Sequence, residues 1–194
     1  MGEKYIVATL NTPFHIEIRN ILNPQGYIHG GNCDGGVSLL RLVRSYNPDF
    51  VVVDMNMQWR ELKQTIETID EEMLCFCILV GDYKNVEITS LIENSMVVSF
   101  CYKPLNREMF INSVEMASIS FIRLIKLDKK LKEAKEDLHS KKLIERAKYI
   151  LMEKESISEN DAYSIIRKKS MDTRLSMKQV AEDIILSHKI SERK

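Results

Sequence analysis

The sequence predicts an α/β domain with a doubly wound parallel sheet, followed by a long helix and a small all-α domain. Two observations support this organisation. Up to about residue 116, short apolar runs alternate with helix-period segments of about ten residues, which is the pattern of βαβ units. Between residues 106 and 152 neither Gly nor Pro interrupts the chain, so one helix can run through this stretch.

The first part contains five candidate strands, each a short apolar run next to turn residues. They are Tyr5–Leu10, Tyr27–Gly30, Phe50–Val53, Leu74–Val80 and Val97–Tyr102. The candidate helices between them have apolar residues at helical spacing and are Phe14–Leu22, Gly36–Ser45, Trp59–Ile69 and Asn85–Asn94. Strands that alternate with helices predict a parallel five-stranded sheet covered on both faces, whose ligands bind at the carboxyl ends of the strands.

Charge is balanced over the 194 residues but is distributed unevenly. The chain has 28 Lys and Arg against 28 Asp and Glu, which argues against a nonspecific binder of polyanions. From residue 140 onward there are 13 basic against 9 acidic residues, and before it 15 against 19. The tail is therefore the part expected to meet a phosphate backbone.

No catalytic, metal or redox site is evident from residue spacing. We expect the cysteines to be reduced core residues, because no C-x-x-C pair occurs among Cys33, Cys75, Cys77 and Cys101. The histidines are spread over different predicted elements and form no cluster in the sequence: His15, His29, His139 and His188. The residues also include no Gly-rich phosphate loop and no nucleophile with a matching base, so we do not expect an enzyme.

A cytoplasmic location is expected. The N-terminus runs directly into the strand candidate Tyr5–Leu10 without the pattern of a signal peptide. No apolar stretch approaches the roughly 18 residues that a membrane-spanning helix needs.

The carboxyl edge of the predicted sheet carries a recognisable pair of residues. Asp54 follows the strand Phe50–Val53 directly, and Lys103, before Pro104, ends the last strand. This arrangement resembles the receiver domain of response regulators over roughly residues 1–120. The resemblance implies a flavodoxin-like fold in which Asp54 is the phosphoacceptor and Lys103 pairs with the phosphoryl oxygens. It also implies that Phe100 is the switch aromatic.

Three positions depart from the receiver pattern. Receivers bind Mg²⁺ through two acidic residues after the first strand, where this sequence has Thr9 and Leu10. The family's Ser or Thr after the fourth strand falls on Gly81. Because Mg²⁺ requires carboxylate oxygens, we expect no metal or other cofactor. Asp54 is then either a phosphoacceptor in an unusual site or, as we favour, the partner of Lys103 in a pseudo-receiver whose signal depends on protein contacts.

The long helix carries an apolar seam, which we assign to residues 117–140. Its members recur at spacings of three and four residues for three heptads, and charged residues flank them: Ala117, Ser120, Leu124, Leu127, Leu131, Ala134 and Leu138. We predict a parallel coiled-coil homodimer with Leu124, Leu127, Leu131 and Leu138 as its main contacts. The alternative is a single helix that packs this stripe on its own domain.

The tail, residues 141–194, contains three short amphipathic helices. Each has one small residue on its apolar side, and these are Ala147, Ala162 and Ala181. Ser158 is a candidate N-cap for a helix over Glu159–Met171, and Ser176 with Gln179 forms a candidate capping box for a helix over Ser176–Ser187. Outside this core lies a polar rim suited to phosphate pairing, base stacking and hydrogen bonding, made up of Arg146, Lys148, Tyr163, Arg167, Lys168, Thr173, Arg174 and Lys178.

The order of short motifs in the tail resembles the ANTAR domain, an RNA-binding antiterminator module. The motifs are Glu145-Arg146-Ala147-Lys148, Ile150-Leu151-Met152, Ser158-Glu159-Asn160-Asp161-Ala162-Tyr163, Met171-Asp172-Thr173-Arg174 and Val180-Ala181. The resemblance implies a bacterial two-component regulator that binds hairpins in nascent mRNA leaders as a dimer and prevents termination, under control of a receiver-like domain at residues 1–116. A histidine kinase or a ligand-binding sensor protein would be its partner. The alternatives are a conventional regulator phosphorylated at Asp54 and an interaction adaptor that binds no RNA.

Overall fold

The computed structural model describes residues 2–57, 59–82, 91 and 93–191. The chain divides into two compact units, Met1–Lys126 and Leu127–Lys194, and the helix α5 (Arg107–Glu155) belongs to both. No helix of the described residues is long and apolar enough to cross a membrane.

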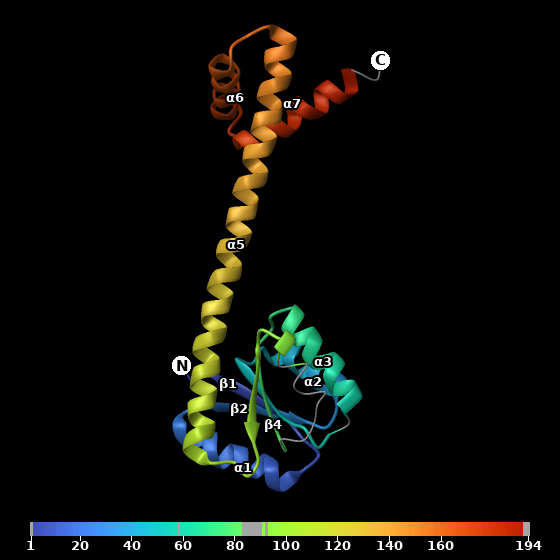
Figure 1. Cartoon of the computed structure of the whole chain (residues 1–194), viewed down its shortest axis with the longest axis vertical. Helices are drawn as coiled ribbons and strands as arrows, with labels where there is room; N and C mark the ends of the chain where they lie inside the picture. Colours follow the sequence, from blue (N-terminus) through green and yellow to red (C-terminus); the bar gives the residue numbers. More distant parts are fainter. Residues whose placement is uncertain (1, 58, 83–90, 92, 192–194) are drawn as a thin grey trace. The chain divides into compact units, whose positions relative to one another are not determined.

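The first unit is built on a five-stranded parallel sheet (Figure 1). Its strands are β1 (Lys4–Ala8), β2 (Ile28–Cys33), β3 (Phe50–Asp54), β4 (Phe76–Gly81) and β5 (Val98–Tyr102). They lie in the order β2-β1-β3-β4-β5, with all neighbouring pairs parallel. Every residue of β3 and β4 is buried, which explains why these strands are continuous apolar runs in the sequence. The predicted doubly wound sheet is confirmed.

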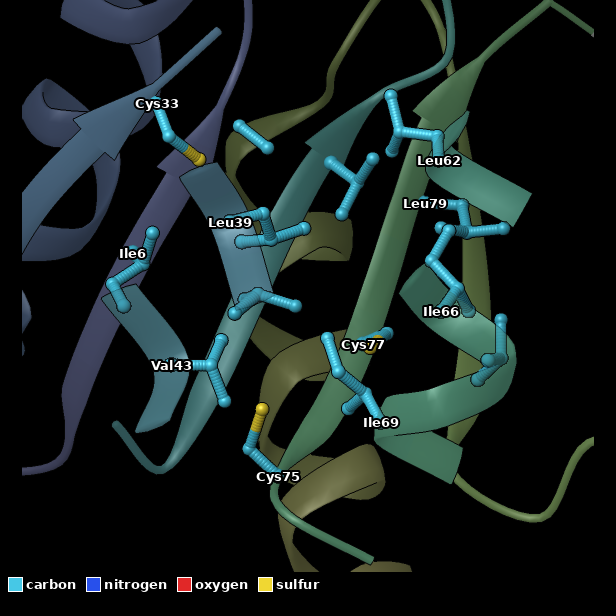
Figure 2. Packing of buried hydrophobic residues seen from close by; sticks show 14 of the residues in the cluster. Ile6, Cys33, Leu39, Val43, Leu62, Ile66, Ile69, Cys75, Cys77 and Leu79 are labelled. Carbon is cyan, nitrogen blue, oxygen red and sulfur yellow. The ribbon is translucent and has the colours of Figure 1, made fainter. Parts of the chain in front are cut away.

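Helices cover both faces of the sheet. On one face, Leu39 and Val43 of α2 (Gly36–Tyr46) and Ile66 of α3 (Trp59–Glu71) pack on Ile6 and Leu79 of the strands (Figure 2). The other face is covered by α1 (Thr12–Leu22), which precedes the short 3₁₀ turn Asn23–Gln25, and by the first turns of α5. All four cysteines are free and buried, as predicted from the sequence.

Two local predictions differ from the structure or lie outside it. The second strand runs from Ile28 to Cys33 and is longer than the predicted Tyr27–Gly30. Two glycines gave this segment little strand character, and pairing with β1 determines its length. Of the helix predicted over Asn85–Asn94, only residues 91, 93 and 94 are described, and these are helical.

The second unit consists of the C-terminal part of α5 with α6 (Glu159–Thr173) and α7 (Met177–Ser191) (Figure 1). Ala147, Ala162 and Ala181 are fully buried in its core, one on each helix. The Asp161 backbone N–H donates to Ser158 Oγ, which confirms this N-cap. The predicted capping box is also present, because the Gln179 N–H donates to Ser176 Oγ and the Ser176 N–H donates to Gln179 Oε1.

The apolar seam of α5 divides between two environments. Ala117 is buried in the core of the first unit, and Leu124 packs against the same core. Leu127, Leu131 and Leu138 are 63%, 52% and 55% exposed. Packing on the chain's own domain therefore accounts for the start of the seam, and the exposed part begins at Leu127.

Candidate functional site

Asp54 lies at the carboxyl end of β3 and is only 1% exposed. Lys103 Nζ donates to its Oδ1 at 2.8 Å, and the Asn56 backbone N–H donates to the same oxygen at 3.2 Å. Thr9 Oγ1 donates to Oδ2 at 2.9 Å. Both carboxylate oxygens are therefore engaged by the protein, and the ion pair that the sequence suggested between Asp54 and Lys103 is present.

Lys103 is held from a second side as well. Its ammonium group lies 4.5 Å from the centroid of the Phe14 ring, close enough for a cation–π contact. Phe14 belongs to α1, whose first turn begins just after β1, so the contact spans three elements: β3, the end of β5 and α1. The cation is thus fixed close to Asp54 and is shared with an aromatic face.

The positions that depart from the receiver pattern are also accounted for. Thr9 is buried, whereas Leu10 is 66% exposed. A Cβ atom at Gly81 would lie 2.7 Å from Cβ of Met55, so Met55 occupies the space that a side chain at residue 81 would need. Phe100 is half-buried and packs edge-on against Tyr102, with their ring centroids 4.8 Å apart.

In the second unit, Lys148 lies inside rather than on the polar rim. It is 6% exposed, and its Nζ donates to Glu145 Oε1 at 2.8 Å and to Glu159 Oε1 at 2.6 Å. The hydrogen bonds to Glu145 and then Glu159 raise the pKa of Lys148. Because Glu159 is the first residue of α6, this lysine links α5 to α6.

Two further rim residues have partners within the unit. Lys178 of α7 pairs with Glu136 of α5, and this pairing raises the pKa of Lys178. Thr173 Oγ1 donates to the carbonyl oxygen of Lys169 at 2.6 Å. The ion pair connects α7 to α5, and the hydrogen bond lies at the C-terminal end of α6. Sequence position alone did not reveal these structural roles of Lys178 and Thr173.

The other rim residues are exposed, and two of them share one side of α6. Tyr163 and Arg167 are one turn apart, and the 70% exposed Met171 follows one turn later. Arg174 comes directly after the helix, where its left-handed backbone (φ 57°) caps the C-terminus of α6. We call Tyr163, Arg167, Met171 and Arg174 the α6 stripe. Among the described residues, neither Arg167 nor Arg174 has an ion-pair partner. Lys168 and, on α5, Arg146 are exposed outside this stripe.

Tyr149 is an exposed aromatic residue that the sequence reasoning did not include. It is 68% exposed on α5. Leu127, Leu138 and Tyr149 are 11 residues apart, close to three helical turns, and therefore lie on one side of α5. This spacing could have identified it.

Comparisons with known proteins agree with this division of the chain. Residues 132–185 match the model of the ANTAR domain. The transcriptional regulatory protein PdtaR of Mycobacterium tuberculosis is 24% identical over 182 residues, which cover 94% of this chain and 89% of that protein. The chain fits an ANTAR-domain response regulator.

Solved structures similar to this regulator share the receiver fold. The receiver domain of a modulated diguanylate cyclase from Desulfovibrio desulfuricans has a TM-score of 0.55 at 18% identity, covering 62% of the regulator and 97% of that chain. The receiver domain of NarL from M. tuberculosis has a TM-score of 0.54 at 17% identity, covering 60% and 96%. At these sequence identities, the comparison shows a shared fold and nothing about function.

The Asp54 environment of the regulator does not fit the Mg²⁺ ion that receivers bind. The depression over Asp54 is lined by Leu10, Asn11, Asn56 and Met57, which add no second carboxylate. The described residues contain no group of three or more His, Cys, Asp or Glu side chains that could hold a metal ion. In addition, Thr9 already donates to Asp54 where a metal would need a carboxylate ligand.

Proposed function

We propose that the regulator binds RNA hairpins in nascent mRNA leaders through the α6 stripe and thereby prevents transcription termination. The observation that carries the proposal is the exposed pair Tyr163 and Arg167 on α6, with the exposed Arg174 at the C-terminal cap of the same helix, in the segment that matches the ANTAR model. Within the described part of the chain, neither arginine has an ion-pair partner. Antitermination itself is an inference from the ANTAR match.

The chemistry of the stripe suits an unpaired RNA loop. Arginine can pair with a phosphate through two parallel hydrogen bonds or stack on a base, and a tyrosine ring offers a face to an unstacked base. Lys148 and Lys178 are already paired with carboxylates, so RNA would have to break those ion pairs to reach them. We therefore assign direct contact to the stripe and treat Arg146 and Lys168 as peripheral cations.

The test is binding to a twin-hairpin RNA by fluorescence anisotropy. We expect Tyr163→Ala to weaken binding by about 1–3 kcal/mol, the usual cost of losing a base–aromatic stack. Arg167→Ala with Arg174→Ala should weaken it further. The matched control, Lys154→Ala with Lys189→Ala, removes the same charge from exposed positions elsewhere in the unit and should have a smaller effect. Equal losses in both double variants would show nonspecific attraction, and no binding by a folded wild-type chain would favour an interaction adaptor.

We further propose that the regulator dimerises along the exposed side of α5, from Leu127 to Tyr149. Charge at the flanks supports a parallel, in-register pair. With Leu131 and Leu138 at heptad position a, Asp137 of one copy faces Lys142 of the other. Arg123 likewise faces Asp128, whereas Lys130 and Lys135 would repel. Two of the three flanking pairs are thus complementary, which favours a second copy of this chain as the occupant.

We infer that the first unit works as a pseudo-receiver. This inference is supported by the hydrogen bonding of Asp54, whose two carboxylate oxygens accept three hydrogen bonds from the protein. The signal would then come from a protein contact, with a ligand-binding sensor protein as partner. The alternative is a histidine kinase that phosphorylates Asp54.

A further inference from the structure

Two histidines that are far apart in the sequence meet at the edge of the first unit. His15 lies on α1 and His29 on the edge strand β2. Their Nε2 atoms are 3.1 Å apart, and their ring centroids are 4.9 Å apart. The histidines form no cluster in the sequence, and the expectation that they stay apart is wrong for this pair because the fold places α1 beside β2.

A β-bulge sets the position of His29. Tyr5 pairs with His29 and Ile6 with Gly31, so Gly30 is an extra residue in β2. Gly31 has a φ of 143°, and a Cβ atom at Gly30 would lie 2.0 Å from the Tyr46 ring, so the two glycines allow this bulge. Bulges commonly redirect a neighbouring side chain. Here the bulge lies directly after the histidine that faces α1.

The surroundings of His29 limit the orientation of its ring. Burial lowers the pKa of His29, and the backbone of Gly31 acts against this effect. Since Nε2 faces His15, the nitrogen that can meet this backbone is Nδ1. A histidine that binds a metal through one nitrogen usually donates the other N–H to a carbonyl or carboxylate, which fixes its tautomer. The Tyr5 ring, whose centroid is 5.3 Å from that of His29, further limits rotation.

We propose that His15 and His29 form a binding site for a borderline transition-metal ion such as Zn²⁺, Ni²⁺ or Cu²⁺. Imidazole nitrogens bind Zn²⁺ at about 2.0–2.1 Å, so two of them in a tetrahedral arrangement are about 3.3–3.4 Å apart. The observed Nε2–Nε2 distance of 3.1 Å is slightly shorter, so the rings would have to separate a little and turn so that both nitrogens face the ion. In the neutral pair, one of the two Nε2 atoms carries the hydrogen that bonds it to the other. On metal binding this hydrogen moves to Nδ1 of the ring that carried it, so the pair releases no proton.

The surroundings set the expected affinity. Burial lowers the pKa of both histidines, and Arg19 lowers both further, which favours the uncharged form that binds metal. The same guanidinium group opposes a cation. Because the described residues contain no cluster of three or more His, Cys, Asp or Glu side chains, water fills the remaining positions. The site should therefore bind in the micromolar range rather than as tightly as a closed structural zinc site.

The test uses the full chain, without a histidine tag and stripped with EDTA, in calorimetric titrations with NiCl₂, ZnCl₂ and MgCl₂. We expect one Ni²⁺ or Zn²⁺ per chain, no Mg²⁺ binding, and a Tm that rises with metal concentration because only the folded state holds both ligands. Either His15→Gln or His29→Gln should weaken binding at least tenfold. Circular dichroism checks that each variant is folded.

The matched control is His139→Gln with His188→Gln, which removes the other two histidines of the chain. It should bind as the wild type does. The proposal is overturned if the wild type binds neither metal, or if folded His15→Gln and His29→Gln bind as tightly as the control. Equal weakening in the control and in the two site variants would also overturn it, because the metal would then bind histidines in general.

Discussion

At the scale of single residues, the environment of Asp54 determines what the first unit can do. Attack on a phosphoryl donor needs a free carboxylate oxygen and cations that stabilise the charge of the transferred group. In this regulator, Oδ1 accepts from Lys103 and the Asn56 N–H, and Oδ2 accepts from Thr9. Thr9 supplies a hydroxyl donor at the position where a receiver has a carboxylate for Mg²⁺, so Lys103 is the nearby charge left to stabilise transfer.

We expect no stable phosphorylation of the wild-type chain by acetyl phosphate with MgCl₂, as measured by intact-mass spectrometry. The double substitution Thr9→Asp with Leu10→Asp introduces the acidic pair that the sequence lacks. It should create Mg²⁺ binding and allow some phosphorylation, because it supplies the carboxylates that the ion requires. Asp54→Asn is the control in both backgrounds. A phosphorylated wild type whose added mass disappears in Asp54→Asn would establish the conventional regulator instead.

At the scale of elements, α5 belongs to two cores and has an exposed side. Its first turns complete the core of the receiver-like unit, and Ala147 and Leu151 form part of the core of the ANTAR unit. Between these regions the leucines of the seam are solvent-exposed. A row of leucines that neither core covers is expensive to leave in water, which is the physical reason to expect a second helix there.

Charge placed in the exposed seam should separate the dimer. Leu131→Lys with Leu138→Lys would bury like charges at facing positions, so we expect light scattering after size exclusion to report a monomer. Both residues are exposed in the single chain, so its own fold should persist. Glu133→Lys, at an exposed position away from both the seam and its flanking pairs, is the control and should remain dimeric. A dimer that survives the double substitution would place the interface elsewhere.

The link between α5 and α6 should depend on pH. The hydrogen bond from Lys148, and then its charge, lower the pKa of Glu159 below its ordinary value of 4.5. A carboxylate with a lowered pKa in the folded state stabilises the fold above about pH 4.5. That contribution is lost as the pH falls through the lower folded value. Melting curves followed by circular dichroism should therefore show a falling Tm below pH 4.5.

Lys148→Met keeps the length of the side chain and removes its charge. We expect this variant to melt at a lower temperature at pH 7, because Glu145 and Glu159 lose their shared partner, and to lose less of its stability on acidification. Lys142→Met, at an exposed position of the same helix, is the control. An unchanged acid dependence in Lys148→Met would show that other carboxylates cause it.

At the scale of the whole molecule, the charge distribution favours polyanion binding by one end only. Residues 140–194 have an excess of four basic residues, while the earlier residues have an excess of four acidic ones. We expect RNA affinity to fall with salt, because cations that pair with phosphates release counterions. Arg167→Ala with Arg174→Ala should reduce the slope of log K against log salt by about two, one for each lost phosphate contact. An unchanged slope would remove these arginines from the interface.

Much of the architecture could be predicted because it depends on local patterns. The alternation of apolar runs with helical segments indicated the parallel sheet, and serine caps marked where α6 and α7 begin. Position along the chain also placed Asp54 and Lys103 at one edge of the sheet, because the carboxyl ends of parallel strands lie together. The ANTAR match agrees with the order of short motifs in the tail.

The sequence by itself determined the two-part organisation, the buried strands and the resemblance to ANTAR-domain regulators, since periodicity and motif order are properties of neighbouring residues. Only the tertiary structure decided which polar side chains are exposed and which are paired. Lys148 and Arg167 are both cations on amphipathic helices, but the packing of α6 on α5 buries the first and leaves the second in solvent. Pairs such as Thr9 with Asp54 and His15 with His29 likewise depend on long-range packing, which no local pattern encodes.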